Sequence, residues 1–118
     1  MGDVLLKSGI KTQRFTNDLG KAIELKINIG DPEVYISWIK KAKEYDDMPK
    51  NLSEIETIQM LRPIISGLLK SLFGEKCYKN INRFCNNNLL AEIKIVETFV
   101  GIIESGMKEY NIKENASK

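Results

Sequence analysis

The chain has 118 residues, of which 42% are apolar and 29% are charged, and it contains only three prolines. These are the length and composition of one ordinary globular domain, long enough to bury roughly two-thirds of its unfolded surface. Its 18 basic and 16 acidic side chains leave a net charge of +2. That balance argues against a dedicated nucleic-acid-binding domain, which needs a clear or clustered excess of basic residues.

The distribution of apolar residues argues against a membrane protein. No apolar stretch approaches the roughly 18 residues that are needed to span a bilayer, and the first apolar run, Val4–Leu6, is far shorter than the core of a signal peptide. We therefore expect a cytoplasmic protein whose thiols stay reduced.

Two absences argue against an enzyme. The chain has no histidine, so the commonest general base and the commonest metal ligand are both missing. The cysteines, Cys77 and Cys85, show no C-x-x-C spacing, which excludes the usual structural zinc arrangements. No carboxylate pair and no glycine-rich loop suggests a site either. We predict no catalytic residue, no metal site and no cofactor.

A β-hairpin is predicted near the start of the chain. From Ala22 to Ile29 apolar and polar residues alternate, which is the pattern of a half-buried strand. The segment from Asn17 to Lys21 has the composition of a turn, so residues 10–15 are expected to pair back on the strand. Residues 3–7 form a weaker candidate for a third strand.

Two amphipathic helices are predicted next. Asp31 is a strong N-cap, Pro32 suits the first helical position, and the apolar face is expected to comprise Tyr35, Trp38, Ile39, Ala42 and Tyr45. The sequence Ser53–Glu56 is a capping box that starts a second helix at Glu54. Its apolar row comprises Ile55, Ile58, Leu61, Ile65, Leu68 and Leu72. Pro63 is expected to kink or divide this helix, and Gly74 to end it.

The segment Phe73–Leu90 contains both cysteines and many asparagines. A short helix from Glu75 to Phe84 would place Cys77, Ile81 and Phe84 on one face, so we interpret both cysteines as packing residues. Lys76, Lys79 and Arg83 would lie on the other side, either as a solvated face or as phosphate contacts.

The last long helix is predicted to begin after a cap at Asn87 or Asn88. One apolar row steps by three and four along it, comprising Leu89, Ile93, Val96, Val100, Ile103, Met107 and Tyr110. A second row beside it comprises Ile95, Phe99 and Ile102. Gly101, Ser105 and Gly106 would allow another helix, of the same chain or of a partner, to approach closely. A face this wide fits either a central core helix or a core helix that also offers a groove to a partner.

The predicted fold is therefore α+β and mostly α, with an N-terminal hairpin of two or three short strands followed by a bundle of three or four helices. The whole chain, 1–118, is expected to form one domain. Within it, residues 1–30 form the hairpin region, 31–110 the helical region and 111–118 a polar tail.

Two segments resemble a known family, the tail assembly chaperones of long-tailed phages and prophages of Gram-positive bacteria. Residues 8–39 are similar to its N-terminal part, in which a "TGIK" strand, a turn with glycine, an apolar strand and an Asp-capped helix follow in order. Residues 53–104 are similar to its C-terminal part, in which a helix ends in Phe-Gly-Glu and an "NN-L" cap precedes the last helix. The matching positions, which we interpret as a structural corner, are Phe73, Gly74, Glu75, Phe84, Asn87, Asn88 and Leu89. Cys85 and Asn86 stand where the family usually has glycine and a basic residue.

The resemblance implies a non-enzymatic function. Such chaperones bind the tape-measure protein, a very long helical polypeptide, and keep it soluble in the host cytoplasm before the tail tube assembles; they are absent from the mature virion. Self-association and contact with the tail-tube protein are further expectations. We expect Trp38, Ile95, Phe99 and Ile102 to form the partner-binding surface. The alternative is a small phage or bacterial regulator that binds a host protein or nucleic acid.

Overall fold

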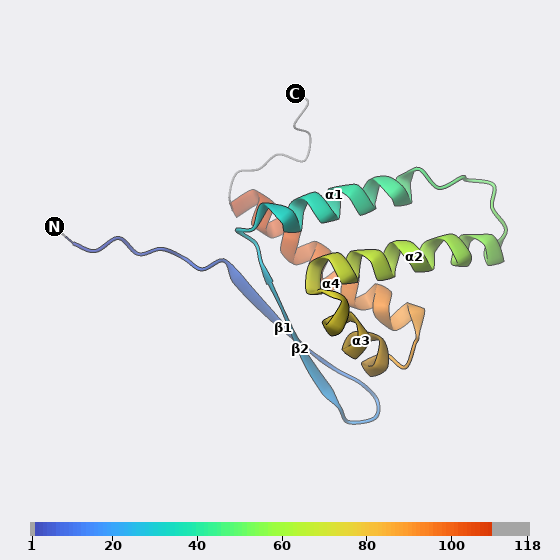
Figure 1. Cartoon of the computed structure of the whole chain (residues 1–118), viewed down its shortest axis with the longest axis horizontal. Helices are drawn as coiled ribbons and strands as arrows, with labels where there is room; N and C mark the ends of the chain where they lie inside the picture. Colours follow the sequence, from blue (N-terminus) through green and yellow to red (C-terminus); the bar gives the residue numbers. More distant parts are fainter. Residues whose placement is uncertain (1, 110–118) are drawn as a thin grey trace.

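The computed structural model describes residues 2–109 and contains a two-stranded antiparallel sheet followed by four helices (Figure 1). In chain order the elements are β1 (Ile10–Thr16), β2 (Ala22–Asn28), α1 (Pro32–Asp46), α2 (Glu54–Phe73), α3 (Glu75–Phe84) and α4 (Leu89–Glu109). The fold is α+β and mostly helical, as predicted. Residues 111–118, the predicted polar tail, and Tyr110 lie outside the described residues.

The hairpin forms at the predicted place. Its strands pair from Ile10 opposite Asn28 to Thr16 opposite Ala22. In the turn, the side-chain oxygen of Asn17 accepts hydrogen bonds from the backbone N–H groups of Leu19 and Lys21, each at 3.0 Å. An Asn side chain that bonds to its own backbone in this way is a common turn-forming device.

The prediction of a possible third strand at Asp3–Lys7 is wrong. Residues 2–8 have no regular secondary structure and run away from the hairpin (Figure 1). The physical reason is that β2 has already ended: Ile29 donates to the carbonyl of Gly9, and the chain after it enters the cap of α1 at Asp31. Within the described part of the chain, residues 2–8 therefore have no neighbouring strand.

The helices begin and end where local backbone chemistry predicts. The carboxylate of Asp31 accepts from the N–H of Glu33 at 3.0 Å. Both hydrogen bonds of the predicted capping box form between Ser53 and Glu56, at 3.0 and 3.2 Å. Gly74 separates α2 from α3 with a φ of +88°, a conformation that glycine adopts without steric cost.

Pro63 does not divide α2, contrary to one of the two predicted outcomes. The helix continues from Glu54 to Phe73 with Pro63 on an exposed position. A proline lacks the N–H that would bond to the carbonyl of the residue four positions earlier. Here that residue is Gln59, which is exposed, so water can donate to its carbonyl in place of the missing N–H. The hydroxyl of Ser66 donates to the carbonyl of Arg62 at 3.0 Å.

Helix α4 occupies the centre of the core. Its Phe99 is fully buried and lies against Phe15 of β1 and Phe73 of α2, with ring centroids 6.0 and 5.1 Å away. The buried apolar residues are Leu25, Ile27, Ile29, Val34, Tyr35, Ile65, Leu68, Leu69, Ile81, Cys85, Ile95, Val96, Phe99, Ile103 and Met107. Residues of the hairpin and of all four helices thus share one core.

The apolar stripes predicted for α1 and α2 extend further than their buried faces. Ile39 and Tyr45 on α1 are 53% and 56% exposed, and Ile55 and Ile58 on α2 are 70% and 55% exposed. Three of these four residues lie near the loop that joins α1 to α2, so the two helices reach past the core at that end. No helix within residues 2–109 is both long enough and apolar enough to cross a bilayer.

Candidate functional site

An apolar groove lies between α1, α2 and α4, with a volume of about 550 Å³. Such a volume falls in the range of ~300–1,000 Å³ that is typical of ligand pockets. Most of the side chains that line it are apolar: Trp38, Ala42, Tyr45, Leu61, Ile64, Ile65, Leu68, Ile93, Val96 and Val100. The groove is therefore suited to apolar side chains of a partner rather than to a polar small molecule.

Charged residues border the apolar surface of this groove. Lys41 and Asp46 come from α1 and Glu97 comes from α4. Lys41 also forms an ion pair with Glu44 at 2.9 Å and keeps only 23% of its side chain exposed. Opposite charges at the edges of an apolar surface can orient a partner that is itself amphipathic.

Two of the four predicted partner-binding residues, Trp38 and Ile102, are half-buried, and the other two, Ile95 and Phe99, lie in the core. Trp38 is half-buried and lines the groove. Ile102 is also half-buried, but it lies at a different hollow, beside Ile29 and Gly106.

Ile95 and Phe99 are core residues, 3% and 0% exposed. The expectation that their side chains form a surface for a partner is wrong, because they pack into the core, where Phe99 meets the hairpin and α2. Ile93, Val96 and Val100, from the other apolar row of α4, line the groove.

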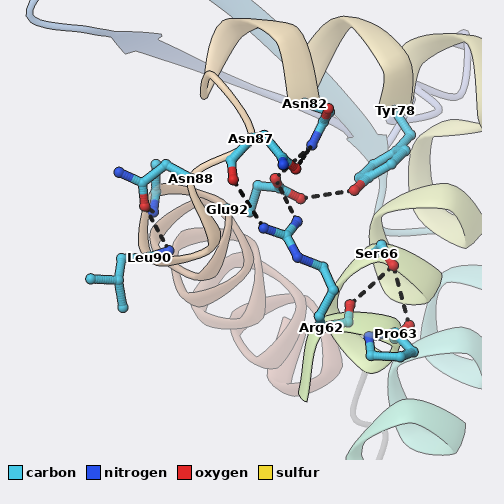
Figure 2. Close-up of polar contacts among 10 residues, drawn as sticks. Arg62, Pro63, Ser66, Tyr78, Asn82, Asn87, Asn88, Leu90 and Glu92 are labelled. Carbon is cyan, nitrogen blue, oxygen red and sulfur yellow. Dashed lines mark hydrogen bonds and ion pairs between the residues drawn. The ribbon is translucent and has the colours of Figure 1, made fainter. Parts of the chain in front are cut away.

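A buried polar cluster lies at the start of α4 (Figure 2). The carboxylate of Glu92, which is fully buried, accepts hydrogen bonds from Arg62 at 2.9 Å, Tyr78 at 3.0 Å and Asn82 at 3.0 Å. Arg62 also donates to the backbone carbonyl of Asn87 at 3.1 Å. The cluster therefore joins α2, α3 and α4 at one point.

Burial and pairing account for the electrostatics of this cluster. The hydrogen bond from Arg62 to Glu92 raises the pKa of the guanidinium further above its ordinary value. Burial is the main cause that raises the pKa of the Tyr78 hydroxyl, and its bond to Glu92 adds to it. Both donors keep their protons at neutral pH. Because both carboxylate oxygens have partners, the arrangement fits a structural link better than an acid or base for catalysis.

The predicted structural corner occupies the region where α2, α3 and α4 meet. Phe73 packs on Phe99, Glu75 lies 3.9 Å from Lys70 in an ion pair, and the carbonyl of Phe84 accepts from the side chain of Asn17 in the hairpin turn at 3.2 Å. The corner thus also anchors the hairpin.

The cap of α4 comes from Asn88, one of the two residues predicted for it. Its side-chain oxygen accepts from the N–H groups of Leu90 and Ala91 at 2.9 and 3.3 Å. Asn87 instead belongs to the polar cluster, since its side-chain oxygen accepts from Asn82 at 3.0 Å. Leu89, the first residue of the helix, packs against the core.

Both cysteines are packing residues, as predicted. Cys85 is buried and Cys77 is half-buried, and neither forms a disulfide. Burial raises the pKa of both thiols. In Cys85 the nearby carboxylate of Glu92 adds to the effect of burial, and the pKa of the thiol reaches about 11. A thiol with so high a pKa stays protonated at neutral pH and is a poor nucleophile.

The basic residues of α3 lie on its exposed side. Lys76, Lys79 and Arg83 are all exposed, whereas Ile81 on the same helix is fully buried. This arrangement is compatible with both interpretations of the basic residues, a solvated face or phosphate contacts. Among residues 2–109, no three His, Cys, Asp or Glu side chains gather in a way that could hold a metal ion.

Sequence reasoning missed the roles of Glu92 and Arg62. One signal was present: Glu92 lies three residues before Ile95 and seven before Phe99, so it continues the buried row of α4. A carboxylate in such a row requires a buried partner. Its partner lies 30 residues away in the chain, however, and no local pattern points to Arg62.

The chain gives no match to known protein-family models, to the curated proteins or to the solved structures. The likeness to tail assembly chaperones therefore depends on the short motifs of residues 8–39 and 53–104 alone.

Proposed function

We propose that this protein is a tail assembly chaperone of a long-tailed phage or prophage. In this proposal it binds the tape-measure protein in the host cytoplasm and keeps it soluble while the tail tube assembles, and it carries out no chemical reaction. The tail-tube protein is a further candidate partner, and the chaperone is absent from the finished virion.

The observation that supports this proposal best is the apolar groove between α1, α2 and α4. An amphipathic helix binds such a groove through apolar side chains spaced by three and four residues. Lys41 on one helix and Glu97 on another would contact the polar sides of the same client helix. Many weak contacts of this kind, repeated along a very long client, add up through avidity.

Co-expression with the tape-measure protein of the same genome tests the proposal. We expect the wild-type chaperone to keep its client soluble and to co-purify with it. Trp38→Ala and Tyr45→Glu should each weaken that binding by about tenfold or more, since truncating an interface anchor commonly costs at least ~1.4 kcal/mol. Tyr45 is 56% exposed, so its replacement should leave the fold intact.

Ile39→Glu is the matched control. Ile39 lies on the same helix and is 53% exposed, but it does not line the groove. The groove is the wrong surface if Tyr45→Glu and Ile39→Glu behave alike while circular dichroism shows both variants folded. A genome in which no tail-tube gene and no long tape-measure gene lie beside this one would contradict the chaperone function itself.

The alternative function is a small regulator that binds nucleic acid or a host protein. The exposed Lys76, Lys79 and Arg83 on α3 favour it. A regulator that binds nucleic acid should bind DNA or RNA with an affinity that falls steeply as salt rises. If the protein is such a regulator, replacing all three residues by glutamine should remove this binding. If it is a chaperone, the wild type should show no salt-dependent binding to nucleic acid, and the triple variant should still co-purify with the tape-measure protein.

A further inference from the structure

The N-terminal arm, residues 2–8, carries a run of apolar side chains that the fold leaves uncovered. Val4, Leu5 and Leu6 are 82%, 88% and 84% exposed, and Figure 1 shows the arm leading away from the hairpin and the helices. Three consecutive exposed aliphatic side chains are unusual on a folded domain and mark an interaction surface. The arm leads directly into β1 and has no strand partner among residues 2–109, because β2 has ended at Asn28.

The arm is complementary to itself when two copies run antiparallel. Its sequence from Asp3 to Lys7 has an acidic residue, three aliphatic residues and a basic residue. If Leu5 lies opposite Leu5 of a second copy, Val4 lies opposite Leu6, and Asp3 lies opposite Lys7 on both sides of the two-fold axis. Apolar and oppositely charged pairs are the ones that stabilise neighbouring strands, and an interface of this symmetry closes as a dimer.

We propose that two copies of this chain associate through these arms, which form a two-stranded antiparallel ribbon from Asp3 to Lys7. This inference concerns a second copy of the chain and does not depend on the proposed chaperone function. A ribbon of two short strands is marginal in water, so the dimer should be weak and its population should rise with protein concentration.

Charge exchange between copies tests the register of the ribbon. In Asp3→Lys, both ends of the ribbon carry two lysines, and in Lys7→Asp both ends carry two aspartates. Each variant alone should associate about tenfold more weakly than the wild type, because two attractive cross-strand pairs become repulsive. An equal mixture of the two should recover the affinity of the wild type, since both lysines of one arm then face the two aspartates of the other.

Sedimentation velocity of the full chain over a wide concentration range measures these affinities. Leu5→Gln should abolish association, whereas Leu90→Gln, the control at a residue that is 77% exposed on α4, should have no effect. All the altered arm residues are exposed, so the fold should survive. The inference is overturned if the wild type stays monomeric at every concentration, if the charge variants dimerise as well as the wild type, or if their mixture does not recover.

Discussion

Glu92 is a carboxylate inside a hydrophobic core, and its three partners explain how it is tolerated there. The side chain of Glu92 is fully buried. Its carboxylate accepts hydrogen bonds from Arg62, Tyr78 and Asn82. A buried charge without partners costs several kcal/mol. The three donors come from two helices, so a single side chain sets how α2 and α3 meet α4.

Replacing Glu92 should therefore destabilise the fold. Glu92→Leu removes the acceptor of the Tyr78 hydroxyl and leaves the half-buried guanidinium of Arg62 with the carbonyl of Asn87 but no carboxylate partner, and we expect the free energy of unfolding to fall by about 2–4 kcal/mol. Urea denaturation followed by circular dichroism measures this loss. Glu104→Leu, at an exposed position of the same helix, should change stability by no more than about 0.5 kcal/mol. Equal stabilities for the two variants would contradict a structural role for the cluster.

At the scale of elements, the connection between α3 and α4 shows why this segment is rich in asparagine. Asn86 and Asn87 adopt φ angles of +54° and +56°, in the left-handed region that asparagine enters more readily than most residues. Asn88 then caps α4. Three neighbouring asparagines thus turn the chain and start the central helix within a few residues.

Removal of this cap should weaken α4 at its start. Asn88→Ala leaves the N–H groups of Leu90 and Ala91 without their side-chain acceptor, and the expected loss is about 1 kcal/mol of unfolding free energy. Asn80→Ala serves as the control because Asn80 is exposed within α3, where alanine is the better helix former. Chemical denaturation should show Asn88→Ala below the wild type and Asn80→Ala at or above it; the reverse order would rule out the cap.

At the level of the whole molecule, α4 approaches the end of the hairpin and α1 closely at Gly106. A Cβ atom built at this residue would lie 2.9 Å from Cβ of Ile29 and 2.9 Å from the hydroxyl of Tyr35. That hydroxyl donates to the carbonyl of Ile29. Gly101, on the same helix, has open space where its Cβ would be. The close approach predicted from these small residues is therefore intramolecular at Gly106.

The two glycines should respond in opposite ways to the same substitution. Gly106→Ala forces α4 away from Ile29 and should cost about 1–3 kcal/mol, which outweighs the gain in helix propensity. Gly101→Ala meets no obstacle and should gain up to about 1 kcal/mol. Thermal unfolding of both variants measures the difference. If both proteins gain stability, α4 does not pack on Ile29 as closely as the structure indicates.

The boundaries of the elements could be predicted because their causes are local. Asp31 caps α1 through the N–H of a residue two positions ahead, and the capping box of α2 involves residues three positions apart. Pro63 shows the limit of such reasoning. Its effect on the helix depends on whether the carbonyl that loses its donor faces solvent or core, and only packing decides that.

An α+β chain, the position of the hairpin and the helix boundaries could be predicted, with the cap of α4 narrowed to Asn87 or Asn88, because hydrogen bonds between near neighbours control these features. Packing sets the environment of each apolar residue of α4, and both rows contribute to the core: Ile95 and Phe99 of one row and Val96, Ile103 and Met107 of the other are buried. Phe99 meets Phe15 and Phe73, whereas Ile93 and Val100 border the groove. The partner of Glu92 was likewise decided by packing, because burial acts between residues that are far apart in the chain and leaves no mark in local spacing.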